Sequence, residues 1–227
     1  MKDTSYSLDM ITPTTIVLMR HAERGPLPKD NIGHDVPITL AGQAAAEELG
    51  RQFGSRLASI STSPVLRCRQ TAEAICLASG TDLPIHVNKL IGGVGAIVNN
   101  TAQALQSYLS MEAHDLVASL ARGTPPVPGF YPISVSIPRI INTTIAHSRG
   151  VPGLHLFITH DVVILLTLLY LLEEPFKQEL WPDFLEQLTL QYDRNVLTVS
   201  YRQRRQPADI NKAPEAGLCI SPEWWLF

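Results

Sequence analysis

Two short apolar segments of this chain each run directly into a polar tip that contains a histidine. Residues 15–19 (Thr-Ile-Val-Leu-Met) precede Arg20-His21, and residues 154–158 precede Thr159-His160-Asp161. Runs of consecutive apolar residues predict strands that are covered on both faces, as in a parallel sheet. Because ligands of open α/β sheets bind beyond the carboxyl ends of the strands, both tips are expected at one functional edge.

The rest of the chain alternates between short strands and helices, which predicts an α/β fold with a mostly parallel central sheet. Thr39 suits a helix N-cap, and Pro64 suits the first turn of the next helix. We expect helices at 43–53, 64–78, 101–120, 137–147 and 162–172, strands at 57–61 and 84–87, and a closing hairpin of strands 188–192 and 196–201.

One region departs from this alternation. Residues 91–100 are glycine-rich and indicate no particular element. Residues 123–138 contain five prolines, which predicts no regular element in that segment. We interpret the 227 residues as a single domain with a cap or insert around 91–149. The proline-rich part is expected to cover the functional edge and to contribute to specificity.

Composition excludes several classes of protein. The 18 basic and 21 acidic residues give a net charge of -3, which argues against broad binding to nucleic acid. The three cysteines (Cys68, Cys76 and Cys219) form no CxxC pair, so neither a disulfide framework nor a thiolate metal site is expected. No secretion signal is recognisable, and the most apolar stretch, residues 162–172, is far shorter than the about 20 residues of a membrane span. These features predict a soluble cytoplasmic protein without a membrane partner.

The strand tips bring together an unusual set of side chains. A third tip follows the strand at 57–61 and carries an arginine. The shared edge would hold three arginines, two histidines and one aspartate: Arg20, His21, Arg24, Arg67, His160 and Asp161. Such a cluster needs an anionic partner, and guanidinium groups bind phosphate oxygens in a bidentate manner. The sequence therefore predicts a phosphate site.

Four separated motifs resemble the histidine phosphatase superfamily, which includes the cofactor-dependent phosphoglycerate mutases. They are Arg20-His21-Ala22-Glu23-Arg24, the stretch Ile38-Thr39-Leu40-Ala41-Gly42-Gln43-Ala44, the segment from Ser61 to Ala72 with Arg67, and Thr159-His160-Asp161. They occur in the family's order and cover roughly residues 15 to 170. The resemblance implies a phosphoglycerate mutase-like, three-layer sandwich with helices on both faces of the sheet.

The resemblance also implies roles for these residues. His21 would attack phosphorus through Nε2, so its other ring nitrogen should donate to a backbone carbonyl. Arg20, Arg24, Arg67 and His160 would hold the phosphate oxygens. Because such a pocket works by positioning and electrostatics, we expect neither a metal ion nor a cofactor.

The proton donor for the leaving group is less clear from the resemblance. Many mutase-like members use a glutamate after the third strand, but here no carboxylate lies between Leu83 and Glu112. The acid-phosphatase branch uses an aspartate directly after the second histidine, and Asp161 stands at that position. We therefore assign Asp161 as the general acid, with Glu23 as the competitor. Ala22 replaces a usual glycine, and we expect the turn to tolerate it.

The favoured function is hydrolysis of a small phosphorylated metabolite through a phosphohistidine intermediate. A phosphomutase is the first alternative, and a non-catalytic protein that binds a phosphorylated ligand is the second. The missing loop glutamate argues against the mutase, and the two histidines with three arginines argue against the non-catalytic protein. The sequence identifies neither the substrate nor the oligomeric state.

Overall fold

The computed structural model describes residues 14–28, 33–148, 151–193 and 196–208. Its strands form one sheet in the order β3-β2-β4-β1-β5-β6-β7. The strands are β1 (Thr14–Arg20), β2 (Leu57–Thr62), β3 (Ile85–Val87), β4 (Gly153–Thr159), β5 (Gln187–Asp193), β6 (Val196–Tyr201) and β7 (Arg204–Ala208). Strands β3, β2, β4 and β1 are parallel, and β5, β6 and β7 extend the sheet antiparallel. The predicted α/β class is confirmed, with a mixed sheet.

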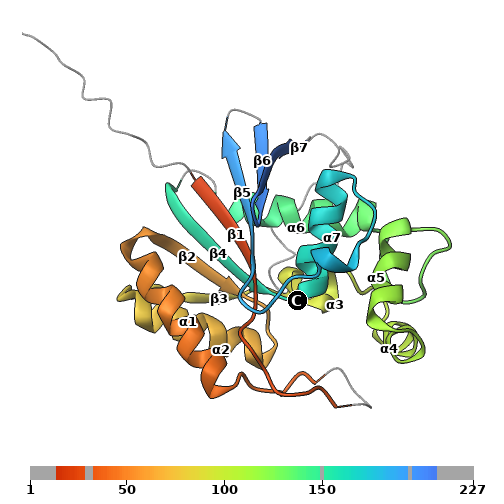
Figure 1. Cartoon of the computed structure of the whole chain (residues 1–227), viewed down its shortest axis with the longest axis horizontal. Helices are drawn as coiled ribbons and strands as arrows, with labels where there is room; N and C mark the ends of the chain where they lie inside the picture. The colour runs from red at the N-terminus through yellow and green to blue at the C-terminus, as the bar shows by residue number, and fades with distance from the viewer. Residues whose placement is uncertain (1–13, 29–32, 149–150, 194–195, 209–227) are drawn as a thin grey trace, which may run out of the picture.

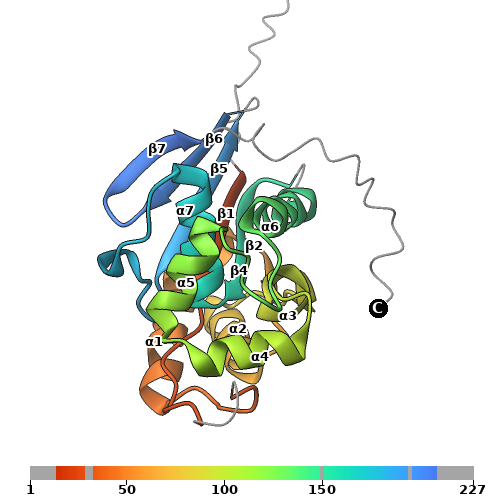
Figure 2. The ribbon, with the colours of Figure 1, turned by 90° about the vertical axis from the view of Figure 1, so that its right-hand side faces the viewer.

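Helices cover both faces of the sheet (Figures 1 and 2). They are α1 (Leu40–Phe53), α2 (Leu66–Ser79), α3 (Gly93–Ala96), α4 (Thr101–Ser110), α5 (Ala113–Arg122), α6 (Ile133–Ser148) and α7 (Asp161–Leu172). Helices α1 and α2 pack on one face, and α5, α6 and α7 contribute to the core on the other. The predicted three-layer arrangement is confirmed.

Strand β1 shows why its apolar residues run consecutively. Ile16 and Leu18 belong to the core shared with α5, α6 and α7, whereas Val17 and Met19 belong to the core shared with α1 and α2. All four side chains are buried. Because successive side chains of a strand point to opposite faces, a strand between two helical layers must be apolar at every position.

The start of α1 is fixed against the loop that follows β1. Thr39 is the N-cap, as predicted, and its side chain accepts a hydrogen bond from the Gly42 backbone. A side chain at Gly42 would lie 2.5 Å from the Glu23 carbonyl oxygen, so only glycine fits there. Helix α1 can therefore approach the segment that carries His21.

Two predicted elements of the region 91–149 are wrong. The single helix expected at 101–120 is two helices, because Met111 and Glu112 adopt extended backbone conformations between α4 and α5. No glycine or proline marks this break in the sequence. The segment 123–138 does contain regular structure, since α6 begins at Ile133 and includes Pro138. The buried residues Ile137 and Ile140 outweigh the one hydrogen bond that Pro138 cannot donate.

Strand β7 is absent from the predicted elements. Its sequence, Arg-Arg-Gln-Pro-Ala, is polar and contains Pro207, so it lacks the usual strand signal. The strand lies at the edge of the sheet, where proline is tolerated because half of the backbone groups need no partner strand.

The remaining sequence expectations have mixed outcomes. Cys68 and Cys76 are buried on α2 as expected, and Cys219 lies outside the described residues. No helix among those residues is long and apolar enough to span a membrane. The single domain over residues 1–227 and the cap role of the region 91–149 stay predictions.

Candidate active site

The carboxyl ends of three parallel strands bring the predicted tips together. Strands β1 and β4 pair with Arg20 opposite Thr159, and the His21 backbone donates to the Thr159 carbonyl at 3.0 Å. The Ser63 backbone donates to the Ile158 carbonyl at 3.0 Å, which brings the start of α2 to the same edge. The three sequence motifs that follow these strands therefore meet at one site.

His21 is held in one tautomer by its own loop. Its side chain is buried, and Nδ1 lies 2.8 Å from the carbonyl oxygen of Ala22. Because a carbonyl can only accept, Nδ1 carries the proton and Nε2 keeps a free lone pair. The Arg67 Nε atom donates to this Nε2 at 3.0 Å. The hydrogen bond from Nδ1 to a backbone carbonyl, which the sequence analysis predicts for a nucleophilic histidine, is therefore present.

Burial and nearby positive charge keep both histidines of the site neutral. Burial lowers the pKa of His21 to about 2, and the neighbouring His160, Arg67 and Arg20 act in the same direction. Burial also lowers the pKa of His160, with Arg67 as the next cause. An unprotonated Nε2 is therefore available on His21 throughout the physiological pH range.

This pKa shift predicts a pH-dependent stability. Below pH 6.5 the unfolded chain protonates His21 whereas the folded chain does not, so stability is lost as the pH falls. From pH 7 to pH 5 the contribution of one such histidine is about 2 kcal/mol. Between pH 7 and pH 5, the free energy of unfolding of the His21→Ala variant should therefore fall by about 2 kcal/mol less than that of the wild type. Urea unfolding at both pH values measures the difference. An equally steep loss in the variant would show that the fold does not hold the ring neutral.

Ala22 is accommodated as expected. Its side chain is fully buried, and its backbone donates to the Thr71 side chain at 3.0 Å. The Thr71 hydroxyl in turn donates to the Arg67 carbonyl at 2.7 Å. This chain of two hydrogen bonds fixes the loop of the first histidine to α2, the helix that carries Arg67.

His160 lies beside His21 and contacts Ser63, which precedes α2, and Cys68 on α2. The two rings meet edge to face with their centroids 5.6 Å apart, and His160 Nε2 lies 3.1 Å from the Ser63 hydroxyl. Cys68 Sγ lies 3.7 Å from the same nitrogen. Burial raises the pKa of Cys68 to about 12, so this thiol is protonated at neutral pH and is no competing nucleophile.

The three arginines approach the histidines from different segments. Arg20 donates to the Pro182 carbonyl at 2.7 Å, and Arg67 donates to the Gly33 carbonyl at 2.7 Å. Arg24 donates to the Gly25 carbonyl at 2.8 Å. Burial lowers the pKa of Arg20 and of Arg67, and the charge of Arg24 lowers both further. The site therefore concentrates positive charge.

Two of these guanidinium groups have unused hydrogen-bonding capacity. In the described part of the chain, the Nε atoms of Arg20 and Arg24 are the buried side-chain nitrogen or oxygen atoms without a partner. Leaving a buried donor unpaired costs about 1–3 kcal/mol, more for a charged group. An anion with several acceptor oxygens would satisfy these donors, as phosphate does.

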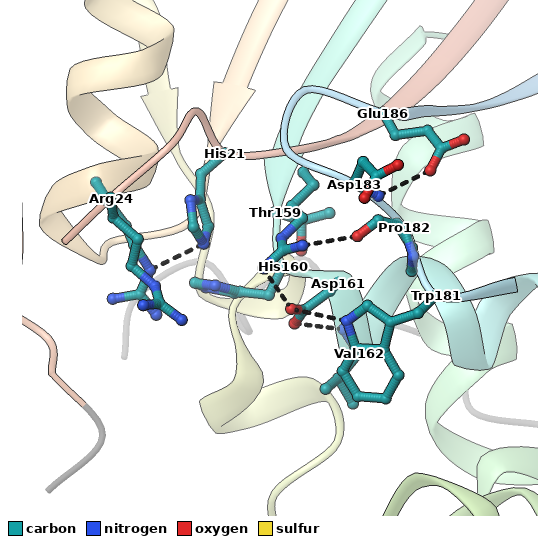
Figure 3. A network of polar contacts seen from close by, with 12 residues as sticks. His21, Arg24, Thr159, His160, Asp161, Val162, Trp181, Pro182, Asp183 and Glu186 are labelled. Atoms are coloured by element: carbon teal, nitrogen blue, oxygen red, sulfur yellow. Dashed lines mark hydrogen bonds and ion pairs between the residues drawn. The ribbon is translucent and has the colours of Figure 1, made fainter. Parts of the chain in front are cut away.

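The two candidate acids lie in different surroundings. Asp161 Oδ2 forms an ion pair with Arg20 at 2.8 Å and accepts from Trp181 Nε1 at 3.3 Å (Figure 3). Glu23 is exposed, and its carboxylate accepts from the Thr39 hydroxyl at 3.2 Å at the start of α1. Asp161 is thus part of the arginine cluster, whereas the Glu23 side chain is bound to a helix start.

The segment between α7 and β5 supplies contacts that the sequence did not predict. Trp181 bonds Asp161, the Pro182 carbonyl accepts from Arg20, and the Phe184 ring lies 4.2 Å from the Arg20 guanidinium carbon. No histidine or arginine in this segment signals a functional site. Ser63 is likewise absent from the predicted site residues, although its position directly after β2 could have indicated a site residue.

A cavity of about 650 Å³ lies elsewhere, near the C-terminal end of α7. Its walls come mainly from α5, α7 and the residues that follow α7, and they include Ala118, Leu169 and Phe176. Asp161 and Leu169 are separated by eight helical residues, or roughly 12 Å along α7. This largely apolar cavity contains none of the clustered histidines, so the phosphate-binding features belong to the strand edge.

Comparison with known proteins gives a family match that covers most of the chain. The model of the histidine phosphatase superfamily (branch 1) matches residues 16–190. No curated protein sequence matches this chain closely enough to count as a relative. The acid-phosphatase-type assignment of the His160-Asp161 motif is not confirmed by the match.

Solved structures share the fold at low sequence identity. A phosphoserine phosphatase variant from Entamoeba histolytica in complex with phosphoserine is 15% identical, with 87% of this chain and 98% of that chain covered and a TM-score of 0.57. A phosphoglycerate mutase from Bacillus anthracis is 14% identical, with 89% and 96% covered and a TM-score of 0.56. A putative alpha-ribazole-5'-P phosphatase from Escherichia coli is 15% identical, with 83% and 95% covered and a TM-score of 0.57.

These structures establish a phosphoglycerate mutase-like fold, and the family match extends over the segments that carry both histidines and all three arginines of the site. The chain belongs to the histidine phosphatase superfamily.

Proposed function

We propose that this chain hydrolyses phosphomonoesters through a phosphohistidine formed on His21. The observation that carries the proposal is the state of the His21 ring. Its Nδ1 is bound to the Ala22 carbonyl, and its unprotonated Nε2 faces a guanidinium group in a cluster of three arginines. A neutral imidazole in a site that binds anions has the two properties required to attack a phosphoryl group.

In the first step, His21 Nε2 attacks phosphorus while the bond from phosphorus to the ester oxygen breaks. Arg67 Nε, which donates to Nε2 at 3.0 Å, is close enough to transfer its hydrogen bond to a phosphoryl oxygen. Arg20, Arg24 and His160 bind the remaining oxygens and stabilise the charge that develops on them. The Nδ1 proton stays on His21, because the Ala22 carbonyl balances the positive charge that the ring acquires.

The leaving oxygen takes its proton from Asp161. The substrate dianion competes for Arg20, the ion-pair partner of Asp161, and places negative charge beside the carboxylate. Trp181 holds the same carboxylate by a hydrogen bond to Oδ2 and so limits its rotation.

In the second step, water attacks the phosphohistidine. The Asp161 carboxylate accepts a proton from the water, the nitrogen–phosphorus bond breaks, and inorganic phosphate and neutral His21 are regenerated. The proposed substrate is a small phosphorylated metabolite, and neither nucleic acid nor a membrane is a proposed partner. The proposed reaction uses no cofactor.

We also propose that the reaction is independent of metal ions. In the described residues, no group of three or more histidine, cysteine, aspartate or glutamate side chains could hold a metal ion, and the arginines already supply positive charge. Phosphate release from an aryl phosphate should be unchanged by a chelator and inhibited by vanadate, which mimics five-coordinate phosphorus. Loss of activity in chelator, restored by added magnesium, would contradict this part of the proposal.

A further inference from the structure

The segment that closes the site after α7 is fixed to the end of β1. Arg20 donates to the Pro182 carbonyl at 2.7 Å from its side chain and to the Glu186 carbonyl at 3.0 Å from its backbone. The Leu185 backbone donates to the His21 carbonyl at 3.4 Å, and Leu185 adopts a left-handed backbone conformation with φ of 60°. These contacts on both sides of residue 184 determine where its side chain points.

Phe184, at the centre of this segment, presents an apolar ring to the site. Its ring centroid lies 5.7 Å from the His21 ring and 4.2 Å from the Arg20 guanidinium carbon. The side chain is nevertheless 37% exposed. A large apolar side chain beside the reacting nitrogen and partly open to solvent can contact whatever is attached to the phosphate.

We propose that Phe184 is a specificity-determining residue that forms an apolar wall for the carbon part of the substrate. The ring adjoins both the nucleophile and a phosphate-binding arginine, so it reaches the groups nearest to a bound phosphate. An alcohol with an aromatic or other flat apolar surface can bury that surface against the ring, whereas a small polar alcohol cannot. The inference rests on the proposed function and narrows its substrate class to such phosphomonoesters.

Binding of two phosphonates, which cannot be hydrolysed, tests the inference without turnover. Benzylphosphonate carries an aromatic ring and methylphosphonate does not. Calorimetry should show that the wild type binds benzylphosphonate about tenfold more tightly than methylphosphonate, because roughly 50–60 Å² of apolar surface leaves water. Phe184→Ala should abolish this preference, and Phe184→Leu should retain a preference of about threefold. In both variants, the affinity for methylphosphonate should differ from that of the wild type by less than about twofold.

Leu77→Ala is the control. Leu77 is also a large apolar side chain that is open to solvent, at 82% exposed, but it lies ten residues after Arg67, near the end of α2, and belongs to no contact of the site described above. Its removal should leave the preference for benzylphosphonate unchanged. An equal loss of affinity for both phosphonates in Phe184→Ala would overturn the inference, since the ring would then serve only to shield Arg20. An unchanged preference in Phe184→Ala, or none in the wild type, would overturn it as well.

Hydrolysis assays separate failure of the inference from failure of the proposed function. If the wild type prefers benzylphosphonate through Phe184 but releases no phosphate from phenyl phosphate, the proposed hydrolysis is wrong and the apolar wall remains. If the wild type releases phosphate from phenyl phosphate and Phe184→Ala keeps the preference for benzylphosphonate, the proposed hydrolysis is supported and the apolar wall is wrong.

Discussion

Replacing His21 with alanine is expected to lower kcat for phosphomonoester hydrolysis by roughly 10⁴-fold or more, while the protein still folds. The loss is large because no other group can form the covalent intermediate: His160 Nε2 is bound to the Ser63 hydroxyl, and the Cys68 thiol is protonated and buried. Release of inorganic phosphate from an aryl phosphate measures the effect. Circular dichroism and thermal unfolding at pH 7 verify the fold of the variant.

His86→Ala is the control for this experiment. His86 is an exposed histidine on the edge strand β3, and the proposed mechanism does not use it. Its replacement should leave kcat within about twofold of the wild type, since exposed positions away from a site contribute little. Full activity in His21→Ala would contradict the proposed mechanism, whatever the result for His86→Ala.

The second large effect concerns the proton donor. If Asp161 is the acid, Asp161→Asn should slow phosphoenzyme formation from an alkyl phosphate by roughly 10²–10⁴-fold. The same variant should lose much less on nitrophenyl phosphate, because a nitrophenolate scarcely needs a proton to leave. Glu23→Gln should show no dependence on the leaving group, since the Glu23 carboxylate is bound to the Thr39 hydroxyl at the start of α1.

Single-turnover rates of both variants on both substrates distinguish the assignments. Asparagine keeps an acceptor for Trp181 but removes the charge that pairs with Arg20. An equal loss on both substrates would therefore mean that Asp161 positions Arg20 or stabilises the start of α7 and donates no proton. If the rate loss of Glu23→Gln depends on the leaving group, the general acid is Glu23 rather than Asp161.

Local sequence patterns were sufficient to predict the elements that build the site edge. Consecutive apolar residues at 16–19 in β1 and at 156–158 in β4 predicted strands between two helical layers, and Thr39 predicted the start of α1. These signals are reliable because burial on both faces and helix capping depend on residues close in the sequence. The parallel pairing of β1 with β4 then brings together two tips that are 139 residues apart in the chain, from His21 to His160.

The errors occurred where tertiary packing overrides local preference. The break between α4 and α5 has no glycine or proline, and α6 continues through Pro138 because its apolar face is buried. The proline-containing strand β7 forms because β6 offers an edge with which it pairs. None of these three outcomes follows from the residues of the segment alone.

In the candidate site, too, some residues follow from local sequence patterns and others depend on tertiary structure. The six predicted residues come from motifs at strand ends, whereas the groups that orient them come from segments distant in sequence. Ser63 meets a histidine 97 residues later, and Trp181 meets an aspartate 20 residues earlier. Such contacts depend on the register of the sheet and on the path of the segment before β5, which no short pattern encodes.

The phosphorylated intermediate provides the most direct test of the account. Wild-type enzyme mixed with a radiolabelled phosphomonoester and quenched in alkali within its first turnover should carry label that is stable to base and lost in acid, as a phosphohistidine is. Peptide mapping should assign the label to His21, and the His21→Ala variant should carry none. Label on another residue, or undiminished labelling of His21→Ala, would contradict the assignment of His21 as the nucleophile.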